Sequence, residues 1–353
     1  MGIRKLLSQI RYIIVIERNI ALLFLIICLR PACNKNGTTS GQNDFANQFS
    51  IRGPVIYQSN QLVQLIGSNA FHVFGPGGAD MNNWHMDIAR EFIGNIREVP
   101  INGGVFQDTN GSFLHSLQEL VDSNRQNNRI TILSAFGWDG RGATQFTGKR
   151  PSQTSWWSEF KQKLAQWAAW FKDQHDVWIE VWNEPYRFDR TDGYTDDIWL
   201  NDMNDLVNTI RNTSNNNIIL VPCAEQGQDE SVLINKGAAF LTNKQNILFD
   251  VHAYEKWLMA SNNSISYRLE QLKQNNLPVI FGEIAPLNAS VLMDPKPFLD
   301  SVYNRGLSIC AWVWKYDGND KDALLNNTGL PNNNNNNNWG SLFKNLSTLP
   351  RKP

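Results

Sequence analysis

The chain has 353 residues, of which 18% are charged, and its formal net charge is −1 at pH 7. Because so few and so balanced charges cannot form a broad basic surface against phosphates, we expect no nucleic-acid partner. The composition also includes 13 Trp, and Trp faces stack well on sugar rings as well as filling cores. A neutral substrate fits this composition better than a charged one.

The first 33 residues are typical of an export signal. Basic residues precede an apolar stretch, Ile20 to Cys28, that is too short to span a bilayer. The junction Leu29 to Cys33 resembles that of bacterial lipoproteins, with Cys33 as the lipidated residue, although ordinary signal cleavage or an uncleaved anchor stay open. We therefore expect a secreted or cell-envelope protein, in contact with a membrane only through this possible N-terminal anchor.

Residues 34–48 are rich in Asn, Gly, Thr and Ser, which predicts a flexible tether, and residues 49–353 then form one folded domain. The runs Ile51 to Tyr57 and Gln61 to Ile66 predict a β-hairpin that caps the floor of this domain. Eight apolar runs predict strands: Phe71 to Phe74, Ile96 to Ile101, Ile130 to Leu133, Val177 to Val181, Ile218 to Val221, Ile247 to Val251, Val279 to Phe281 and Leu307 to Val313.

Amphipathic segments alternate with these strands and predict helices. They are Trp84 to Ile93, Phe113 to Asn124, Trp156 to Gln174, Ile198 to Arg211, Ser231 to Leu241, Ser264 to Gln274 and Pro297 to Arg305. Apolar strands alternating with helices indicate parallel pairing, and eight such units close into a (β/α)₈ TIM barrel; a doubly wound open sheet is the alternative. The Asn-rich tract 332–338 predicts a solvated loop before a last helix, Trp339 to Leu346.

Two of the predicted strands end in a carboxylate. The run through Val181 leads into Asn183-Glu184-Pro185, and the run Val279 to Phe281 leads through Gly282 into Glu283. In a barrel the carboxyl ends of the strands form the active-site face. Two carboxylates that meet there suit glycosidic cleavage, where one protonates the leaving oxygen and the other attacks the anomeric carbon.

From about Phe49 to Trp339 the chain resembles glycoside hydrolase family 5, the cellulase-like retaining (β/α)₈ enzymes. The Asn-Glu-Pro after strand four and the Glu that ends strand seven carry the resemblance, and by it Glu184 is the acid/base and Glu283 the nucleophile. The segment Asn95 to Pro100 is similar to the family's second strand. By this resemblance Arg97 hydrogen-bonds the nucleophile.

The resemblance also implies the residues that bind the sugar. Asn183 binds the 2-hydroxyl, His252 and Tyr254 line the subsite of the reacting sugar, and Trp314, in the Trp312-Val313-Trp314 segment, lies beneath that sugar. One departure is that the family often has a His at the end of strand three, where this chain has Ser134 to Asp139. Three further candidates for the walls of the cleft are His72, Trp138 and Trp257.

We therefore expect a retaining, endo-acting β-glycoside hydrolase that cleaves a β-1,4-linked polysaccharide by double displacement, with cellulose or β-glucan first and β-mannan second. It would work as a monomer without a metal or cofactor, since the histidines and cysteines show no metal spacing and no phosphate-binding loop follows the first strand. Alternatives of another class are a non-catalytic carbohydrate-binding surface lipoprotein and a purely structural envelope protein.

Overall fold

A computed structural model describes residues 49–72, 78–93, 98–102, 104–107, 111, 113–137, 146–315, 321–334 and 337–352. The segments predicted as export signal and tether, and with them Cys33, lie outside these residues. Within the described part, no helix has both the length and the apolar character needed to cross a membrane.

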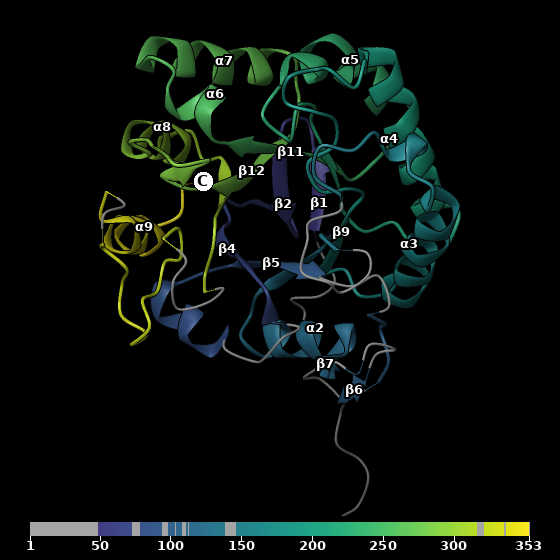
Figure 1. Ribbon diagram of the computed structural model, residues 1–353, viewed down its shortest axis with the longest axis horizontal. Coiled ribbons are helices and arrows are strands. Elements are labelled where there is room, and N and C mark those ends of the chain that lie inside the picture. Colours follow the sequence, from purple (N-terminus) through teal and green to yellow (C-terminus); the bar gives the residue numbers. More distant parts are fainter. Residues whose placement is uncertain are drawn as a thin grey trace, which may run out of the picture. The chain divides into compact units, whose positions relative to one another are not determined.

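The described residues form a closed barrel of parallel strands in the order β10-β11-β12-β15-β4-β5-β8-β9, with helices around it (Figure 1). The predicted (β/α)₈ TIM barrel is thus confirmed. The barrel strands are β4 (Ile66–Ala70), β5 (Ile88–Ile93), β8 (Ile130–Ala135), β9 (Val177–Glu180), β10 (Ile219–Pro222), β11 (Ile247–Ala253), β12 (Val279–Ile284) and β15 (Ser308–Ala311).

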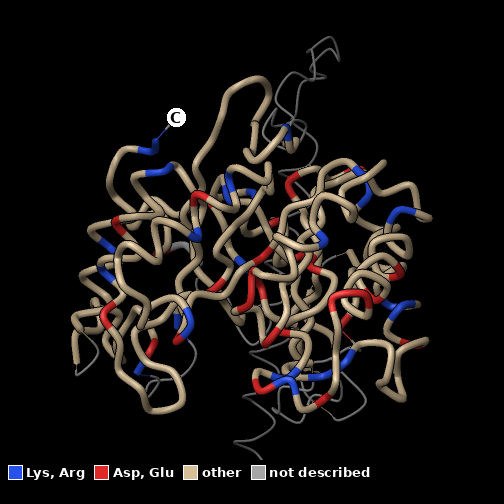
Figure 2. Tube along the Cα trace, turned by 90° about the horizontal axis from the view of Figure 1, so that it is seen from above, with Lys and Arg blue, Asp and Glu red and all other residues tan. Residues whose placement is uncertain are grey.

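The helices that cover the barrel have one apolar face each, as the sequence predicts, and the buried face packs on the strands. They are α2 (Leu117–Gln126), α3 (Trp157–Phe171), α4 (Asp196–Arg211), α5 (Ser231–Leu241), α6 (Glu255–Leu258), α7 (Asn262–Gln274), α8 (Lys296–Asn304) and α9 (Trp339–Ser347), with 3₁₀ turns η3 (Gly78–Trp84) and η4 (Pro151–Gln153). Over the described residues, basic and acidic positions are interspersed along the chain (Figure 2).

A small antiparallel sheet of β1 (Phe49–Arg52), β2 (Val55–Gln58) and β3 (Gln61–Leu62) precedes the barrel. The predicted turn at Ser59 joins β2 to β3, and a second turn at Gly53, which we did not predict, joins β1 to β2. Phe49 packs edge-on against Trp178 at 5.5 Å, and both lie in a cluster with apolar side chains from the barrel strands. The small sheet thus closes the barrel floor, as predicted.

Two further hairpins lie in loops of the barrel. Strands β6 (Val105–Gln107) and β7 (Phe113–His115) precede α2, and strands β13 (Leu287–Asn288) and β14 (Val291–Leu292) follow β12. The predicted helix from Phe113 therefore begins only at Leu117, after Ser116 caps its first turn by accepting from Glu119 N.

The first two predicted barrel strands were wrong. Strand β4 begins at the last residue of the expected hairpin arm, Gln61 to Ile66, and ends before the expected first barrel strand, Phe71 to Phe74; β5 lies within a predicted helix. The misleading residues are polar. Strand β4 reads Ile-Gly-Ser-Asn-Ala and β5 reads Ile-Ala-Arg-Glu-Phe-Ile, yet every residue of both is buried. Polar side chains that point into a barrel or beneath its helices remove the apolar run by which a buried parallel strand is recognised.

Candidate active site

The two candidate catalytic carboxylates converge at the carboxyl edge of the barrel. Glu184 follows strand β9, Glu283 lies in β12, and one oxygen of each is within 4.8 Å of the other. Glu184 has a φ of 49°, a left-handed conformation that few residues other than glycine adopt. Such strain concentrates at functional positions, and here it accompanies the turn that brings Glu184 over the barrel.

Arg90 is the hub of the site. Its Nη1 donates to Glu283 Oε1 at 2.7 Å and to Asn69 Oδ1 at 2.8 Å, its Nη2 donates to Asn183 Oδ1 at 2.9 Å, and its Nε donates to Glu180 Oε2 at 2.8 Å. The side chain is wholly buried. One fixed guanidinium therefore orients the candidate nucleophile and the candidate sugar-binding amide together.

This contact corrects the assignment of Arg97. Arg97 lies outside the described residues, and the guanidinium that reaches Glu283 comes from Arg90 on β5. The misassigned strand explains the error, because a second strand placed at Ile96 to Ile101 makes Arg97 its natural inward cation.

Tyr254 is a second hydrogen-bond donor to Glu283, the candidate nucleophile. The Tyr254 hydroxyl donates to Glu283 Oε2 at 2.7 Å, so each oxygen of this carboxylate accepts a hydrogen bond. Burial raises the pKa of Glu283, while the positive charges of His252 and Arg90 oppose the rise. The two donors therefore counteract the cost of keeping a buried carboxylate ionised.

His252 links the two catalytic candidates to the barrel interior. Its Nδ1 lies 3.2 Å from Glu184 Oε1, and its Nε2 lies 3.5 Å from Asp250 Oδ2. Burial alone favours the neutral ring, but the carboxylates of Glu283 and Asp250 raise the pKa of His252 well above its ordinary value. The ring thus faces three carboxyl groups, which favour its protonated form.

Thr147 is a contact of Glu184 that the sequence did not reveal. Its hydroxyl donates to Glu184 Oε2 at 2.9 Å, while Asn183 Nδ2 lies 3.4 Å from the same hydroxyl oxygen. Glu184 is thus held between Thr147 on one oxygen and His252 on the other. No motif marks Thr147, because it lies in the loop between β8 and α3.

A cleft of about 190 Å³ opens over these groups. Both glutamates, Asn183 and Tyr254 line it together with Phe136, Thr147, Leu287, Asn288, Trp312 and Asp322. Polar groups on an apolar and aromatic wall are what a sugar ring requires, since its hydroxyls need partners and its C–H faces need stacking.

Of the two tryptophans in the segment where an aromatic floor was predicted, Trp312 lines the cleft and Trp314 does not. Trp314 is 2% exposed and packs edge-on against Trp84 at 5.1 Å. Trp312 lines the cleft and packs edge-on against Phe71 and Phe92. The two tryptophans are two positions apart, and in a strand such residues share a face. The sequence alone therefore could not tell which of them lines the cleft.

Two other candidates for the cleft have structural surroundings. His72 Nδ1 contacts Glu91 Oε1 at 2.7 Å, and Glu91, which faces the helix side of β5, also accepts from Asn124. Trp257 is fully buried and packs against Phe281 at 5.3 Å. Neither lines the described cleft, and Trp138 lies outside the described residues.

Two groups of side chains have donor atoms close enough for a metal ion among the described residues. One is Glu184, His252 and Glu283, and the other is Glu180, Asp250 and His252. Arg90 contacts both groups, with Nη1 at 2.7 Å from Glu283 Oε1 and Nη2 at 2.6 Å from Glu180 Oε2. A fixed cation thus already contacts one carboxylate of each group.

Comparison with known proteins identifies relatives of the chain. The sequence pattern of the family described as Cellulase (glycosyl hydrolase family 5) matches residues 76–318. A mannan endo-1,4-beta-mannosidase of Cellvibrio japonicus is 25% identical over 284 residues, which cover 79% of this chain and 61% of that protein. Another mannan endo-1,4-beta-mannosidase, from Salipaludibacillus agaradhaerens, is 20% identical, with coverage of 78% and 84%.

Solved structures show the same architecture. The catalytic domain of a mannanase from Streptomyces sp. SirexAA-E superposes with a TM-score of 0.65 at 16% identity, over 92% of this chain and 98% of that one. At this identity the likeness concerns the fold, and the chemistry must be argued from the side chains described above.

Proposed function

This chain belongs to glycosyl hydrolase family 5, and from that premise we propose that it is a retaining, endo-acting β-1,4-mannanase. The observation that carries the reaction type is the approach of an oxygen of Glu184 to within 4.8 Å of an oxygen of Glu283. Retaining glycosidases hold their carboxyl groups about 5 Å apart, whereas inverting ones leave room for a water.

Double displacement gives each group a role. Glu184 protonates the glycosidic oxygen while Glu283 attacks the anomeric carbon, and the glycosidic bond breaks as the ester to Glu283 forms. Glu184 then takes a proton from the water that breaks this ester. Asn183, oriented by Arg90, donates to the sugar 2-hydroxyl, a contact that strengthens in the transition state.

The choice of mannan rests on the relatives, since those described above are named as enzymes acting on mannan. This reverses our sequence-based order, which placed β-1,4-glucan first. Glucan remains the second candidate, because the family's own description is cellulase. The loops that shape the outer subsites determine whether mannan or glucan is bound, and these loops vary more than the barrel does.

The test is reducing-sugar release from β-1,4-mannan, carboxymethyl cellulose, xylan and β-1,3-glucan. We expect mannan to be cleaved fastest, with a rapid drop in viscosity that marks internal cuts. Glu184→Gln and Glu283→Gln should each lose roughly 10³-fold or more in kcat, and Glu159→Gln, at an exposed position on α3, should match the parent. Binding of mannan without cleavage by the parent would instead support the carbohydrate-binding alternative.

We also propose that residues 1–33 direct export and that Cys33 carries a lipid. Support comes from the order of a basic start, a short apolar stretch and a cysteine before a polar tether. Mass spectrometry of the membrane-extracted protein should find acyl chains on Cys33, and Cys33→Ser should abolish them. An unmodified Cys33 within an intact N-terminus would contradict the proposal.

A further inference from the structure

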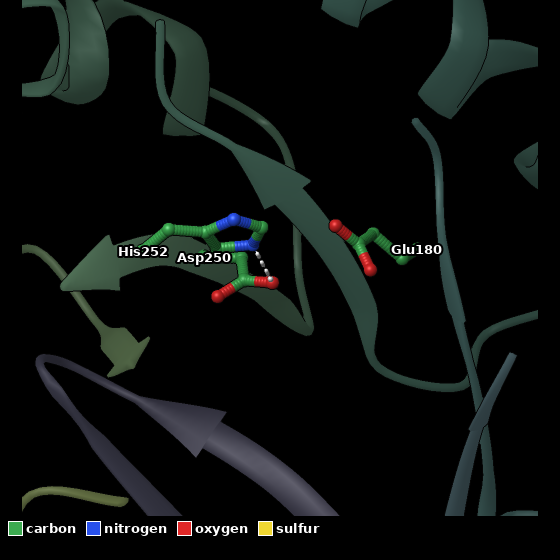
Figure 3. Close-up of side chains that lie close together, drawn as sticks. All are labelled: Glu180, Asp250 and His252. Atoms are coloured by element: carbon green, nitrogen blue, oxygen red, sulfur yellow. Dashed lines mark ion pairs between the residues drawn. The ribbon is translucent and has the colours of Figure 1, made fainter. Parts of the chain in front are cut away.

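Beneath the catalytic pair, the barrel interior holds a carboxyl group that the proposed reaction does not use. Glu180 ends strand β9 and is wholly buried, and it faces Asp250 and His252 across the interior (Figure 3). One donor atom from each of the three lies within 4.8 Å of the others. A carboxyl group in such a place must be either paired or neutral.

Hydrogen bonds to Glu180 fall on one oxygen only. Arg90 Nε donates to Oε2 at 2.8 Å, and Nη2 lies 2.6 Å from the same atom. Glu180 Oε1, by contrast, has no hydrogen-bond partner among the described residues, and neither has Asp250 Oδ2. A proton on Oε1 would turn that oxygen from an acceptor without a partner into a donor.

The charge balance of the interior points the same way. Two buried cations, Arg90 and His252, face three buried carboxyl groups, Glu180, Asp250 and Glu283. With all three ionised the interior would hold an uncompensated negative charge, which is costly in a low-dielectric setting. One proton removes that excess.

The three carboxyl groups differ in how many donors and cations stabilise their ionised form. Asp250 accepts from Gly282 N at 2.7 Å and contacts both cations, and Glu283 accepts hydrogen bonds on both oxygens. Glu180, by contrast, has Arg90 as its one cation within ion-pair distance among the described residues, and its oxygen Oε1 lacks a hydrogen-bond partner within 3.5 Å. Among the described residues it is the group on which the proton costs least.

We propose that Glu180 is a neutral carboxylic acid in the folded enzyme and serves as a positioning residue, which anchors Arg90 without competing with Glu283 for its charge. A neutral Glu180 still accepts the Arg90 hydrogen bonds through Oε2. Its Oε1 hydroxyl is then a donor within the interior that also holds Asp250 and His252. The role toward Glu283 rests on the proposed function, whereas the protonation of Glu180 does not.

Burial supports this assignment, because it raises the pKa of Glu180 to about 8 against the opposing charge of Arg90, with Asp250 adding to the rise. Among the described residues, the groups that face Glu180 are Arg90 on β5, Ser134 on β8, Asp250 and His252 on β11, and the Cys310 thiol on β15. The charge of His252 and a hydrogen bond from Ser134 also oppose the rise in this pKa, but burial outweighs them.

Infrared difference spectroscopy tests the protonation directly. The full chain at pH 6 should show a carboxylic-acid C=O band that shifts in D₂O and is missing from Glu180→Gln. The exposed variant Glu159→Gln should keep the band. An identical carboxylic-acid region in the parent and in Glu180→Gln would overturn the proposal, and so would a stoichiometric metal ion that the parent retains and Glu180→Gln loses.

Kinetics test the positioning role. Gln mimics the neutral acid, with one oxygen that accepts and one nitrogen that donates. Glu180→Ala should lower kcat by roughly 100-fold with little change in KM, and Glu180→Gln should recover at least about tenfold of that loss. Equal losses in both variants would overturn the role. If the parent hydrolyses no glycan at all, the proposed function fails, and the infrared result still decides the protonation.

Discussion

Both oxygens of Glu283, the proposed nucleophile, accept a hydrogen bond although the carboxylate is buried. One accepts from Arg90 and the other from Tyr254 at 2.7 Å. Removing the second donor in Tyr254→Phe leaves the ring in place but deprives the carboxylate of a hydrogen bond. We expect kcat/KM to fall by roughly 10- to 100-fold, whereas Tyr267→Phe, at a position 65% exposed on α7, should have no effect.

The same variant has a signature in its pH profile. The Tyr254 hydroxyl lowers the pKa of Glu283 because it stabilises the ionised form, while burial raises that pKa overall. Activity should therefore rise with pH as Glu283 ionises, and the acidic limb of kcat/KM should move to higher pH in Tyr254→Phe. A limb that stays in place, or moves to lower pH, would show that Glu283 is not the group that titrates.

Thr147 allows the acid/base role of Glu184 to be tested apart from the nucleophile. Thr147→Val keeps the shape but removes the hydroxyl that donates to Glu184 Oε2 at 2.9 Å. The kcat/KM for mannan should fall about tenfold, while kcat/KM for a dinitrophenyl glycoside, whose leaving group needs no proton in the first step, should equal that of the parent. Thr147→Ser, which retains a hydroxyl, should restore mannan cleavage. Equal losses on both substrates would contradict a role through Glu184.

At the scale of elements, β4 packs closely against β5 near the start of both strands. A Cβ on Gly67 would meet the Ile88 carbonyl oxygen at 2.1 Å, and that oxygen is backbone. Gly67→Ala should therefore reduce the free energy of unfolding by about 2–3 kcal/mol, measured by urea denaturation. In Gly237→Ala the added carbon meets the end of the Leu277 side chain at 2.6 Å, which can move, and the helix gains about 1 kcal/mol. Similar losses of unfolding free energy in both variants would contradict the view that the backbone contact at Gly67 causes the destabilisation.

The same two strands explain where prediction from sequence failed. From β8 onward the strands are apolar runs, and their predicted positions agree with the structure within a few residues. Strand β5 carries Arg90 and Glu91 side by side, one toward the site and one toward α2, so its pattern looked amphipathic. The residues that make β5 functional are those that concealed it.

At the scale of the whole molecule, the motifs at the ends of β9, β11 and β12 were sufficient to predict the centre of the site, because the barrel brings strand ends together. Thr147 and Asp322 were not predictable in this way. They reach the cleft from loops, where no periodic pattern relates position in sequence to position in space.

The buried proton also predicts how stability depends on pH. Glu180 has an ordinary pKa of 4.5 that rises to about 8 on folding. The folded state thus binds the extra proton between these values, so the stability from Glu180 is complete below pH 4.5 and is lost as pH rises toward 8. As pH rises from 5 to 8.5, the free energy of unfolding of Glu180→Gln relative to that of the parent should increase by roughly 3–5 kcal/mol, measured by urea denaturation. A constant difference would mean that Glu180 is ionised throughout.

The central claim is that Glu283 forms a covalent bond to the sugar. A 2-deoxy-2-fluoro-mannosyl fluoride tests it most directly, because the fluorine slows both steps while the good leaving group speeds the first, so the ester accumulates. Mass spectrometry of the digested protein should find one added fluoromannosyl group, on the peptide and residue of Glu283. An adduct on Glu184, or hydrolysis that inverts the anomeric configuration with no adduct, would contradict the account.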